Sequence, residues 1–530
     1  MQLGTLHFWL NSGSADLLWE WNNPRVAHPE WPSETLYRPQ QVLTATGSTL
    51  PVLWNHSITF QKLQRFAHGE LLLEEMADWL LGHQKQSEDG FFSLYGNDVE
   101  VFDFRPGRYM SEEPIQKDGE WARIRDLIQH LNTDRRFKFV LPSQALERGL
   151  KPQATALRLE SPEQPAPVKK QTKYNIVRWA VTGRDDYTIN SQCHQILQAF
   201  ERAPGVGDDD WRQLLFHWGS DFRTHITDER WGALQRSIKA LFTRWVVTSA
   251  RTETRSTLQA AFGVGFSSSV KISQDDRFIQ IDSDRISCVL NVRRGLAIHK
   301  WIDREVSEKS VFGTLPIGSF ESIRLGADWY TGNLTFHPPG FPQVTDLAAV
   351  TPEMNTIGHS VVLNVKVDTP LGRIRKTLTV NTYEGSAHLR HHTHFSSEVG
   401  SLRFGHVALR AEDHRSDGFF YRTKLGGPVV EVFDLRGRDF DHGQGISNLI
   451  SANQTLGNTE GVVDLLVGGF GVQATLDPDS RGAAGMVSVR KDASAGLVRL
   501  CFSAREVDDT SQPSSRRKQG LGLMLRAIPS

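Results

Sequence analysis

The feature that most constrains the fold is the alternation of apolar and polar residues through the C-terminal half of the chain. From Phe262 onward, short runs of this pattern are separated by Gly, Pro, Asn and Asp. Side chains of a strand point alternately to opposite faces, so the pattern predicts half-buried strands joined by turns. So long a stretch predicts a large β-sandwich, and no short repeat of the propeller type is visible. The clearest runs are 278–282, 361–367, 376–380 and 461–466.

The first half of the chain has a different hydrophobic pattern. Residues 1–150 mix short strands with helical spacing of apolar residues over 60–81 and 120–131, which is typical of an α/β unit. The Pro-rich, charged stretch 161–170 has the composition of a linker or long surface loop. The sequence therefore predicts an α/β domain at 1–160, followed by a linker at 161–172.

A helical segment is predicted between this linker and the sandwich. Apolar residues recur at helical spacing over 189–200, 210–218 and 227–245, so two or three helices fit best. Asp210 and Thr227 are expected as helix N-caps, since their side chains can accept hydrogen bonds from free backbone N–H groups. The expected domains are a helical subdomain at 173–260 and a β-sandwich at 261–530.

Charge and cysteine content limit the partners and the compartment. The 530 residues carry 60 basic and 61 acidic side chains and a net charge of −1. This balance gives no excess of positive charge that would favour nucleic acid or an anionic membrane as a partner. Cys193, Cys288 and Cys501 are widely separated, which argues for a reducing compartment. No apolar run approaches a membrane span, and a cytoplasmic protein is predicted. The 14 Trp residues suit a sugar-binding protein as well as a core.

Two acidic residues stand out in the α/β part. In the stretch Asp98-Val99-Glu100-Val101, a strand would place both carboxylates on one face. Neighbouring carboxylates in a partly dry site push their pKa values apart, so that one can stay protonated as an acid. The same alternation is typical of a half-exposed strand whose acids face water. Both interpretations stay open on this stretch alone.

The context of these acids resembles glycoside hydrolase family 57, particularly its 4-α-glucanotransferase branch. Residues 98–102, Asp-Val-Glu-Val-Phe, resemble the Asp-x-Glu-x-Phe segment of that family. The order of an α/β segment, helices and a β-sandwich is also similar, and the resemblance covers about 35–245 and, more loosely, the sandwich. Further matches lie at 36–39, 51–55, 58–60, 105–107 and 218–222, the last with Phe222 in place of a Trp.

The resemblance implies a multidomain fold and a mechanism. The fold would be a partial (β/α) barrel, a helical subdomain and a mutarotase-like β-sandwich. Family members are retaining enzymes, which use an acid and a nucleophilic carboxylate. Asp98 would be the general acid/base, Glu100 a supporting residue and Arg105 a substrate-binding residue.

The nucleophile is the point at which the chain departs from the family. The family's nucleophilic Glu lies on a barrel strand well upstream of the Tyr-Arg-Pro segment, and only 36 residues precede Tyr37 here. Glu30 and Glu34 lie in a superficially similar motif but stand too close to Tyr37. We therefore expect an incomplete catalytic unit, whose missing barrel part carries the nucleophile.

Two further groups of residues are candidates for binding a glycan. In the helical segment, Trp218 can stack on a sugar ring, while Asp221 and Arg223 can bind hydroxyls; equally, Trp218 can be core and Asp221 can cap a turn. In the sandwich, Asp328 and Trp329 make a plausible sugar contact. A weaker cluster, Asp439, Asp441 and His442, can equally be a turn.

One predicted strand places His388, Arg390, His392 and His394 on a single face. Paired His residues suit a metal or acid–base chemistry, but no acidic third ligand is spaced for a metal, and a polar outer face or a sugar-facing wall fits better. We expect neither a metal nor another cofactor.

The function that fits these patterns is a glycoside hydrolase or glucanotransferase acting on an α-glucan or a related polysaccharide. The alternative is a non-catalytic carbohydrate-binding protein derived from such an enzyme. A barrel of the polysaccharide deacetylase type is a third possibility, but it needs a metal held by Asp and paired His, and 1–160 shows no such set.

Overall fold

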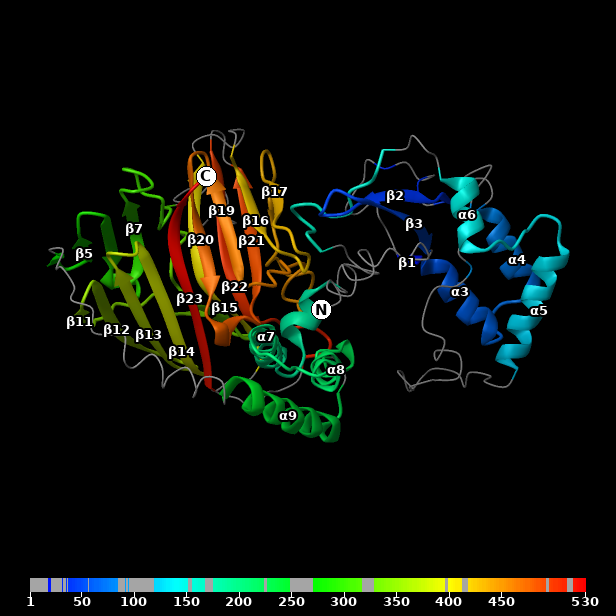
Figure 1. The fold of residues 1–530 in the computed structure, drawn as a ribbon, viewed down its shortest axis with the longest axis horizontal. Helices are drawn as coiled ribbons and strands as arrows, with labels where there is room; N and C mark the ends of the chain where they lie inside the picture. The colour runs from blue at the N-terminus through cyan, green and yellow to red at the C-terminus, as the bar shows by residue number, and fades with distance from the viewer. Residues whose placement is uncertain are drawn as a thin grey trace. The chain divides into compact units, whose positions relative to one another are not determined.

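The structure is a computed structural model and forms two compact units. Unit 1 comprises 1–4, 162–166 and 175–530, and unit 2 comprises 5–161 and 167–174. Each unit is described by itself (Figure 1). The described residues are 18–20, 31, 35, 37–55, 57–83, 91, 94, 119–150, 155–166, 175–223, 226–247, 270–316, 328–395, 399–411, 418–491, 495–511 and 518–530.

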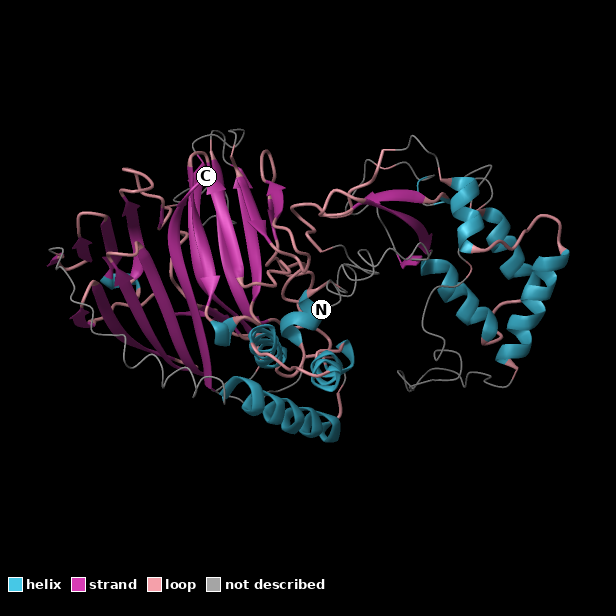
Figure 2. Ribbon diagram, in the orientation of Figure 1, coloured by secondary structure: helices cyan, strands magenta, loops and turns pink. Residues whose placement is uncertain are grey.

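Unit 1 is dominated by two large antiparallel sheets (Figure 2). The first is 11-stranded and has the order β18-β21-β22-β15-β8-β7-β6-β5-β4, with β9 and β10 joined to it at β15. Its strands are β4 (Lys271–Gln274), β5 (Phe278–Asp282), β6 (Ile286–Asn291), β7 (Ala297–Asp303), β8 (Phe312–Gly313), β9 (Thr335–His337), β10 (Val344–Thr345), β15 (Ser401–Ala411), β18 (Phe440–Asp441), β21 (Ala484–Lys491) and β22 (Gly496–Arg505).

The second sheet is 9-stranded, in the order β11-β12-β13-β14-β23-β20-β19-β16-β17. One core cluster combines buried residues of both sheets, such as Ile281 and Phe404 of the first with Leu378 and Leu523 of the second. The two sheets therefore enclose a common core, as in a β-sandwich. Its strands are β11 (Glu353–Ile357), β12 (Ser360–Thr369), β13 (Gly372–Asn381), β14 (Ser386–Phe395), β16 (Phe420–Thr423), β17 (Glu431–Asp434), β19 (Val462–Val467), β20 (Phe470–Leu476) and β23 (Lys518–Pro529).

The helical segment of unit 1 precedes the sandwich in the chain. It contains the π-helical turn η5 (Arg178–Thr182), α7 (Asp186–Arg202), α8 (Asp208–His217), the short 3-10 turn η6 (Ser220–Phe222), α9 (Asp228–Phe242) and a second π-helical turn, η7 (Thr243–Val247). The three α-helices of this segment agree with the expectation from sequence.

Of the two expected N-caps in this segment, one is confirmed. Thr227 caps α9, because its hydroxyl accepts a hydrogen bond from the Arg230 N–H at 3.4 Å. The prediction for Asp210 is wrong, because α8 begins two residues earlier, after Gly207. The Asp210 carboxylate instead accepts hydrogen bonds from Arg244 at 3.0 Å and from the indole of Trp245 at 3.3 Å.

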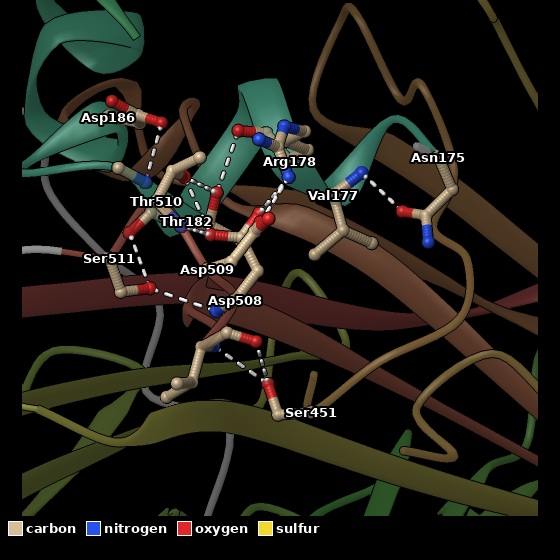
Figure 3. Close-up of polar contacts among 12 residues, drawn as sticks. Asn175, Val177, Arg178, Thr182, Asp186, Ser451, Asp508, Asp509, Thr510 and Ser511 are labelled. Carbon is tan, nitrogen blue, oxygen red and sulfur yellow. Dashed lines mark hydrogen bonds and ion pairs between the residues drawn. The ribbon is translucent and has the colours of Figure 1, made fainter. Parts of the chain in front are cut away.

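A polar junction attaches the helical segment to the sandwich (Figure 3). Arg178 of η5 is buried and pairs with Asp508 and Asp509, which follow β22. The Glu506 N–H donates to the Val181 carbonyl at 2.9 Å. Arg178 and its two acidic partners are more than 300 residues apart in the sequence. The junction is therefore a tertiary contact that a local sequence pattern cannot predict.

The segment 162–166, here called the strap, lies on the sandwich. The Tyr421 hydroxyl donates to the Pro162 carbonyl at 3.0 Å, and the Gln454 amide donates to the Ala166 carbonyl at 2.7 Å. His442 also bonds the Pro162 carbonyl, through Nε2 at 2.9 Å. The strap is therefore fixed at both of its ends, although composition suggested a linker here. The expected domain boundaries stay predictions.

Unit 2 contains a small mixed sheet in the order β1-β3-β2 and four described helices. The predicted helix at 60–81 is two helices, because Gly69, at a positive φ of 83°, turns the chain between α3 and α4. The elements are β1 (Leu18–Glu20), β2 (Gln40–Leu43), β3 (Thr49–Asn55), α3 (Ser57–Ala67), α4 (Leu73–Gly82), α5 (Glu120–Thr133) and α6 (Pro142–Gly149). Among the described helices, none has both the length and the apolar character needed to cross a bilayer.

Candidate substrate-binding site

The residues predicted to bind or transform a substrate fall into three groups. Asp98, Glu100 and Arg105 lie outside the described residues. The second group comprises Trp218, Asp221 and Arg223, which lie together between α8 and α9. The third comprises Asp328 and Trp329, which lie beside the first sheet of the sandwich.

Trp218 closes the C-terminus of α8 and is half-buried. Its indole N–H donates to the Asn190 side-chain carbonyl at 3.1 Å, and its ring meets His194 edge-on at a centroid distance of 4.7 Å. Both partners lie on α7. Trp218 also packs against the core cluster of the helical segment, as the alternative interpretation expected, and its indole is thereby held in one orientation.

Arg223 lies beneath the surface, because only 1% of it is exposed. It donates through Nη2 to the same Asn190 oxygen at 3.1 Å. Within the described part of the chain, its Nε and Nη1 have no hydrogen-bond partner. Asn190 thus accepts from both Trp218 and Arg223. The predicted role of Arg223 in substrate binding stays a prediction.

Asp186, at the start of α7, adds a second buried polar group beside Arg223. Its Oδ2 accepts a hydrogen bond from the Gly183 N–H at 3.0 Å. Burial raises the pKa of Asp186 to about 8, although the positive charge of Arg223 opposes this rise. A Cβ on Gly183 would lie 2.2 Å from the Arg223 carbonyl oxygen, so this close approach requires glycine.

Asp221 is exposed, and so are two apolar residues at the end of α8. Leu215 and Phe216 at the end of α8 are 63% and 65% exposed, and the Phe216 ring contacts Phe222 at 5.1 Å between centroids. Phe216 and Trp218 lie at the end of α8, and Asp221 lies in the η6 turn that follows it. We call Phe216, Trp218 and Asp221 the aromatic–acid surface.

Asp328 and Trp329 lie in the sandwich and not on the aromatic–acid surface. Trp329 is only 9% exposed, packs against Ala408 and Leu497, and has the Arg499 guanidinium 5.9 Å from its ring. Asp328 accepts a hydrogen bond from the Tyr330 hydroxyl at 3.3 Å. Trp329 therefore contributes mainly to packing, while Asp328 lies at a polar edge; their predicted role in sugar binding remains to be tested.

The histidine row lies on β14 at alternate positions, as expected. His388 and Arg390 contact Asp477, at 2.8 Å and 3.3 Å respectively. These contacts suit a polar outer face. Across the described ranges, no group of three or more His, Cys, Asp or Glu side chains could hold a metal ion.

Sequence reasoning missed Asn190, Asp186 and Phe216. The sequence pattern that could have identified Asn190 is the presence of a polar residue on the buried face of α7, between Ile189 and Cys193. Phe216 was assigned to an apolar helix, and only the structure shows that its ring is exposed.

Replacement of Asn190 by alanine is expected to lower the free energy of unfolding by about 2 kcal/mol, because two buried donors lose one acceptor. Chemical denaturation followed by Trp fluorescence measures this loss, and a red-shifted native emission is expected as Trp218 gains contact with water. Glu201→Ala, on an exposed position of the same helix, is the control. Equal stabilities of the two variants would contradict the role of Asn190.

Comparisons with known proteins show a likeness of fold. No family model matches the chain, and no curated protein matches it. An α-mannosidase from Enterococcus faecalis V583 superposes with a TM-score of 0.51 at 9% identity, over 93% of this chain and 70% of that chain. At this identity the comparison establishes the fold alone: the chain has a fold like that of a carbohydrate-active enzyme.

Two other solved structures have lower scores. A 4-α-glucanotransferase from Thermococcus litoralis has a TM-score of 0.31 at 11% identity, over 96% of this chain and 77% of that chain. A protein in the glycosyl hydrolase family 38 from Enterococcus faecalis has a TM-score of 0.48 at 7% identity, over 93% of this chain and 69% of that chain.

Proposed function

We propose that the protein is a glycoside hydrolase or glucanotransferase of the family 57 type that acts on α-linked glycans. The observation that carries the proposal is the likeness of fold to an α-mannosidase over 93% of the chain. The Asp-Val-Glu-Val-Phe segment at 98–102 supports the proposal, because it resembles the family segment that carries the general acid, here Asp98. In this proposal, unit 2 corresponds to part of a (β/α) barrel.

The proposed mechanism retains the configuration of the sugar and uses two carboxylates. Asp98 donates a proton to the leaving glycosidic oxygen and later accepts one from the incoming water or hydroxyl, while Glu100 supports its ionisation. Separately from this chemistry, the aromatic–acid surface of unit 1 is proposed to bind glycan: Phe216 and Trp218 pack against sugar rings and Asp221 accepts hydrogen bonds from hydroxyls. Asn190 acts as a positioning residue for the Trp218 indole, and Arg223 is proposed to take part in substrate binding.

Replacement of Asp98 by asparagine is expected to lower glycosidase or transglycosylase activity by about 10²- to 10⁴-fold, because the acid/base is lost. Release of reducing sugar and formation of transfer products from a panel of α-glucans and α-mannans measure the effect. Asp103→Asn, at another acid of the same stretch, is the matched control. Equal activity of wild type and Asp98→Asn would remove Asp98 from the mechanism.

The second candidate function is a non-catalytic carbohydrate-binding protein. The aromatic–acid surface favours it, because glycan binding there needs no catalytic carboxylate. Retained glycan affinity without any turnover, with loss of that affinity in Trp218→Ala, would select this function over the first.

We also propose a cytoplasmic location. It is supported by the three cysteines, which are buried and free in the structure. Fractionation of cells that express the natural protein tests the location, and recovery in an extracytoplasmic fraction would reject it.

A further inference from the structure

A row of basic side chains crosses the outer face of the second sheet. β12, β13 and β14 are neighbouring strands of this sheet (Figure 1). Their registers place Lys366 opposite Arg375, and Arg375 opposite His392. Residues in register share a face, and all three side chains are exposed, whereas the adjacent Ile374 belongs to the common core. We call Lys366, Arg375 and His392 the basic row.

Folding stability does not explain the basic row. Cations directly opposite each other on neighbouring strands repel and are destabilising. Lys366 lies 3.7 Å from the exposed carboxylate of Glu353, but within the described part of the chain Arg375 and His392 form no ion pair. The positive charge of Arg375 is therefore left without a partner among these residues.

Protection of a sheet edge does not explain the row either. Proteins place charges, Lys above all, on edge strands to prevent pairing with other chains. β13 is paired on both sides, with β12 and β14, and β14 is paired with β13 and β23. Arg375 and His392 therefore lie on interior strands, where this need does not arise. Binding of an anion accounts for cations at these positions.

The surroundings of the basic row make Arg375 its centre. One step along the strands, Arg373 pairs with Asp368 at 2.6 Å. On the other side of the row, Arg390 contacts Asp477 at 3.3 Å. β12, β13 and β14 are described throughout, and of their guanidinium groups that of Arg375 is the one without a carboxylate partner.

The row is open at its β23 end. Gly520 of β23 is in register with His392. A Cβ at Gly520 would have the His392 ring, at 3.6 Å, as its nearest neighbour. β23 therefore presents no side chain beside the imidazole at this position, and the surface there is flat.

Neutral polar groups adjoin the basic row. Asn364 and Thr377 are in register on the same face, and the Thr377 hydroxyl donates to the Asn364 side-chain oxygen at 2.7 Å. The Asn364 amide can donate to a ligand hydroxyl, and the Thr377 oxygen can accept from one. The outward positions at 362–368, 373–379 and 388–394 carry no Phe, Tyr or Trp. Single-stranded nucleic acids are bound on such rings, so this face suits an anion that also carries hydroxyls.

We propose that the basic row binds an acidic glycan, that is, a polysaccharide whose sugars carry carboxylate or sulfate groups. The guanidinium of Arg375 holds one anionic group through two parallel hydrogen bonds. Lys366 and His392 lie one strand to either side, about 4.8 Å away, and contact the flanking sugars. The proposal goes beyond the proposed function and does not depend on it, because it concerns binding on the sandwich and no catalytic step.

Binding of defined hexasaccharides to the full chain tests the proposal. The probes are an oligogalacturonate, which carries carboxylates, a heparin oligosaccharide, which carries sulfates, and neutral maltohexaose, all measured by calorimetry at one low salt concentration. Wild type is expected to bind at least one acidic probe at least about tenfold more tightly than maltohexaose, because only the acidic probes form charge-assisted hydrogen bonds. The acidic probe that is preferred identifies the anionic group.

Two arginines of the same strand provide the variant and its control. Arg375→Gln is expected to lower the affinity for the acidic probe by about tenfold or more, because the unpaired guanidinium is removed. Arg373→Gln removes a guanidinium from the same face that is already paired with Asp368, and a loss below about threefold is expected. Thermal melting checks folding, and Arg375→Gln should melt no lower than wild type, since it relieves the repulsion within the row.

Three results would overturn the proposal. The first is equal affinity of wild type for the neutral and the acidic hexasaccharides. The second is an equal loss of affinity in Arg375→Gln and Arg373→Gln, which would indicate unspecific attraction to the overall charge of the face. The third is tighter binding of a single-stranded oligonucleotide than of an acidic hexasaccharide of the same charge, which would assign the row to nucleic acid.

Discussion

Replacement of Asp346 by asparagine is expected to lower the free energy of unfolding of the sandwich by about 3–5 kcal/mol, because it leaves a buried charge without its partner. Asp346 lies between the sheets with Lys376 and His391, and the side chains of all three are fully buried. Its Oδ2 lies 3.2 Å from Lys376 Nζ and 3.2 Å from His391 Nε2.

The electrostatics of this site explain the size of the effect. Burial alone would raise the pKa of Asp346, but Lys376 and His391 hold it below its ordinary value. In Asp346→Asn the Lys376 ammonium would keep only the Gly295 carbonyl, at 2.8 Å. The low dielectric of the interior strengthens the attraction between Asp346 and Lys376. For the same reason, a buried Lys376 charge without this partner is costly in free energy.

Hydrogen exchange of the β13 and β14 amides under increasing denaturant measures this loss locally. A local measurement is needed because a chain of two units does not have a single unfolding transition. Asp368→Asn removes the acid of an exposed ion pair with Arg373 on the same sheet, and a much smaller effect is expected because solvent screens exposed pairs. Asp346→Leu combined with Lys376→Met should recover much of the loss, because no unpaired charge remains. Equal effects of Asp346→Asn and Asp368→Asn would contradict the assignment.

Acidification from about pH 7 to about pH 5 is expected to cost about 2 kcal/mol through His442 alone. The Val487 N–H donates to Nδ1 at 3.2 Å, so Nε2 carries the proton that bonds the Pro162 carbonyl. Burial lowers the pKa of His442 from 6.5 to about 4, although its bond to Pro162 opposes this shift.

The sign of the effect follows from this pKa shift. In the unfolded chain His442 binds a proton below its ordinary pKa of 6.5, whereas in the folded chain its pKa is about 4. Stability therefore falls as the pH drops through this window. Burial also lowers the pKa values of His391 and His406, and both add to the loss.

His442→Gln tests the contribution, because glutamine can accept from Val487 and donate to Pro162 without titrating. The free energy of unfolding and the exchange of the strap amides, measured at the two pH values, should depend less on pH in this variant by about 2 kcal/mol. An unchanged pH dependence would exclude His442 as the titrating group.

Periodicity was a good guide to the sandwich. The run 278–282 is β5, and the runs 361–367 and 376–380 lie within β12 and β13. Alternation is reliable here because one face of each strand packs in the common core while the other is polar. The pairing order of the sheets was not predictable, since β23 pairs with both β14 and β20, across long stretches of sequence.

The candidate site was predictable only in part. Trp218 was proposed from its residue type, but its setting depends on Asn190, which lies 28 residues before it. Such a hydrogen bond leaves no local pattern.

The strap has a consequence for the connectivity of the protein. The chain leaves unit 2 after Ser161, and the strap, 162–166, then lies on the sandwich. A single engineered cut between 167 and 174 would therefore not release unit 2 from the sandwich, because hydrogen bonds to Pro162 and Ala166 would still hold the fragments together. The nicked protein would therefore behave as a complex of two fragments.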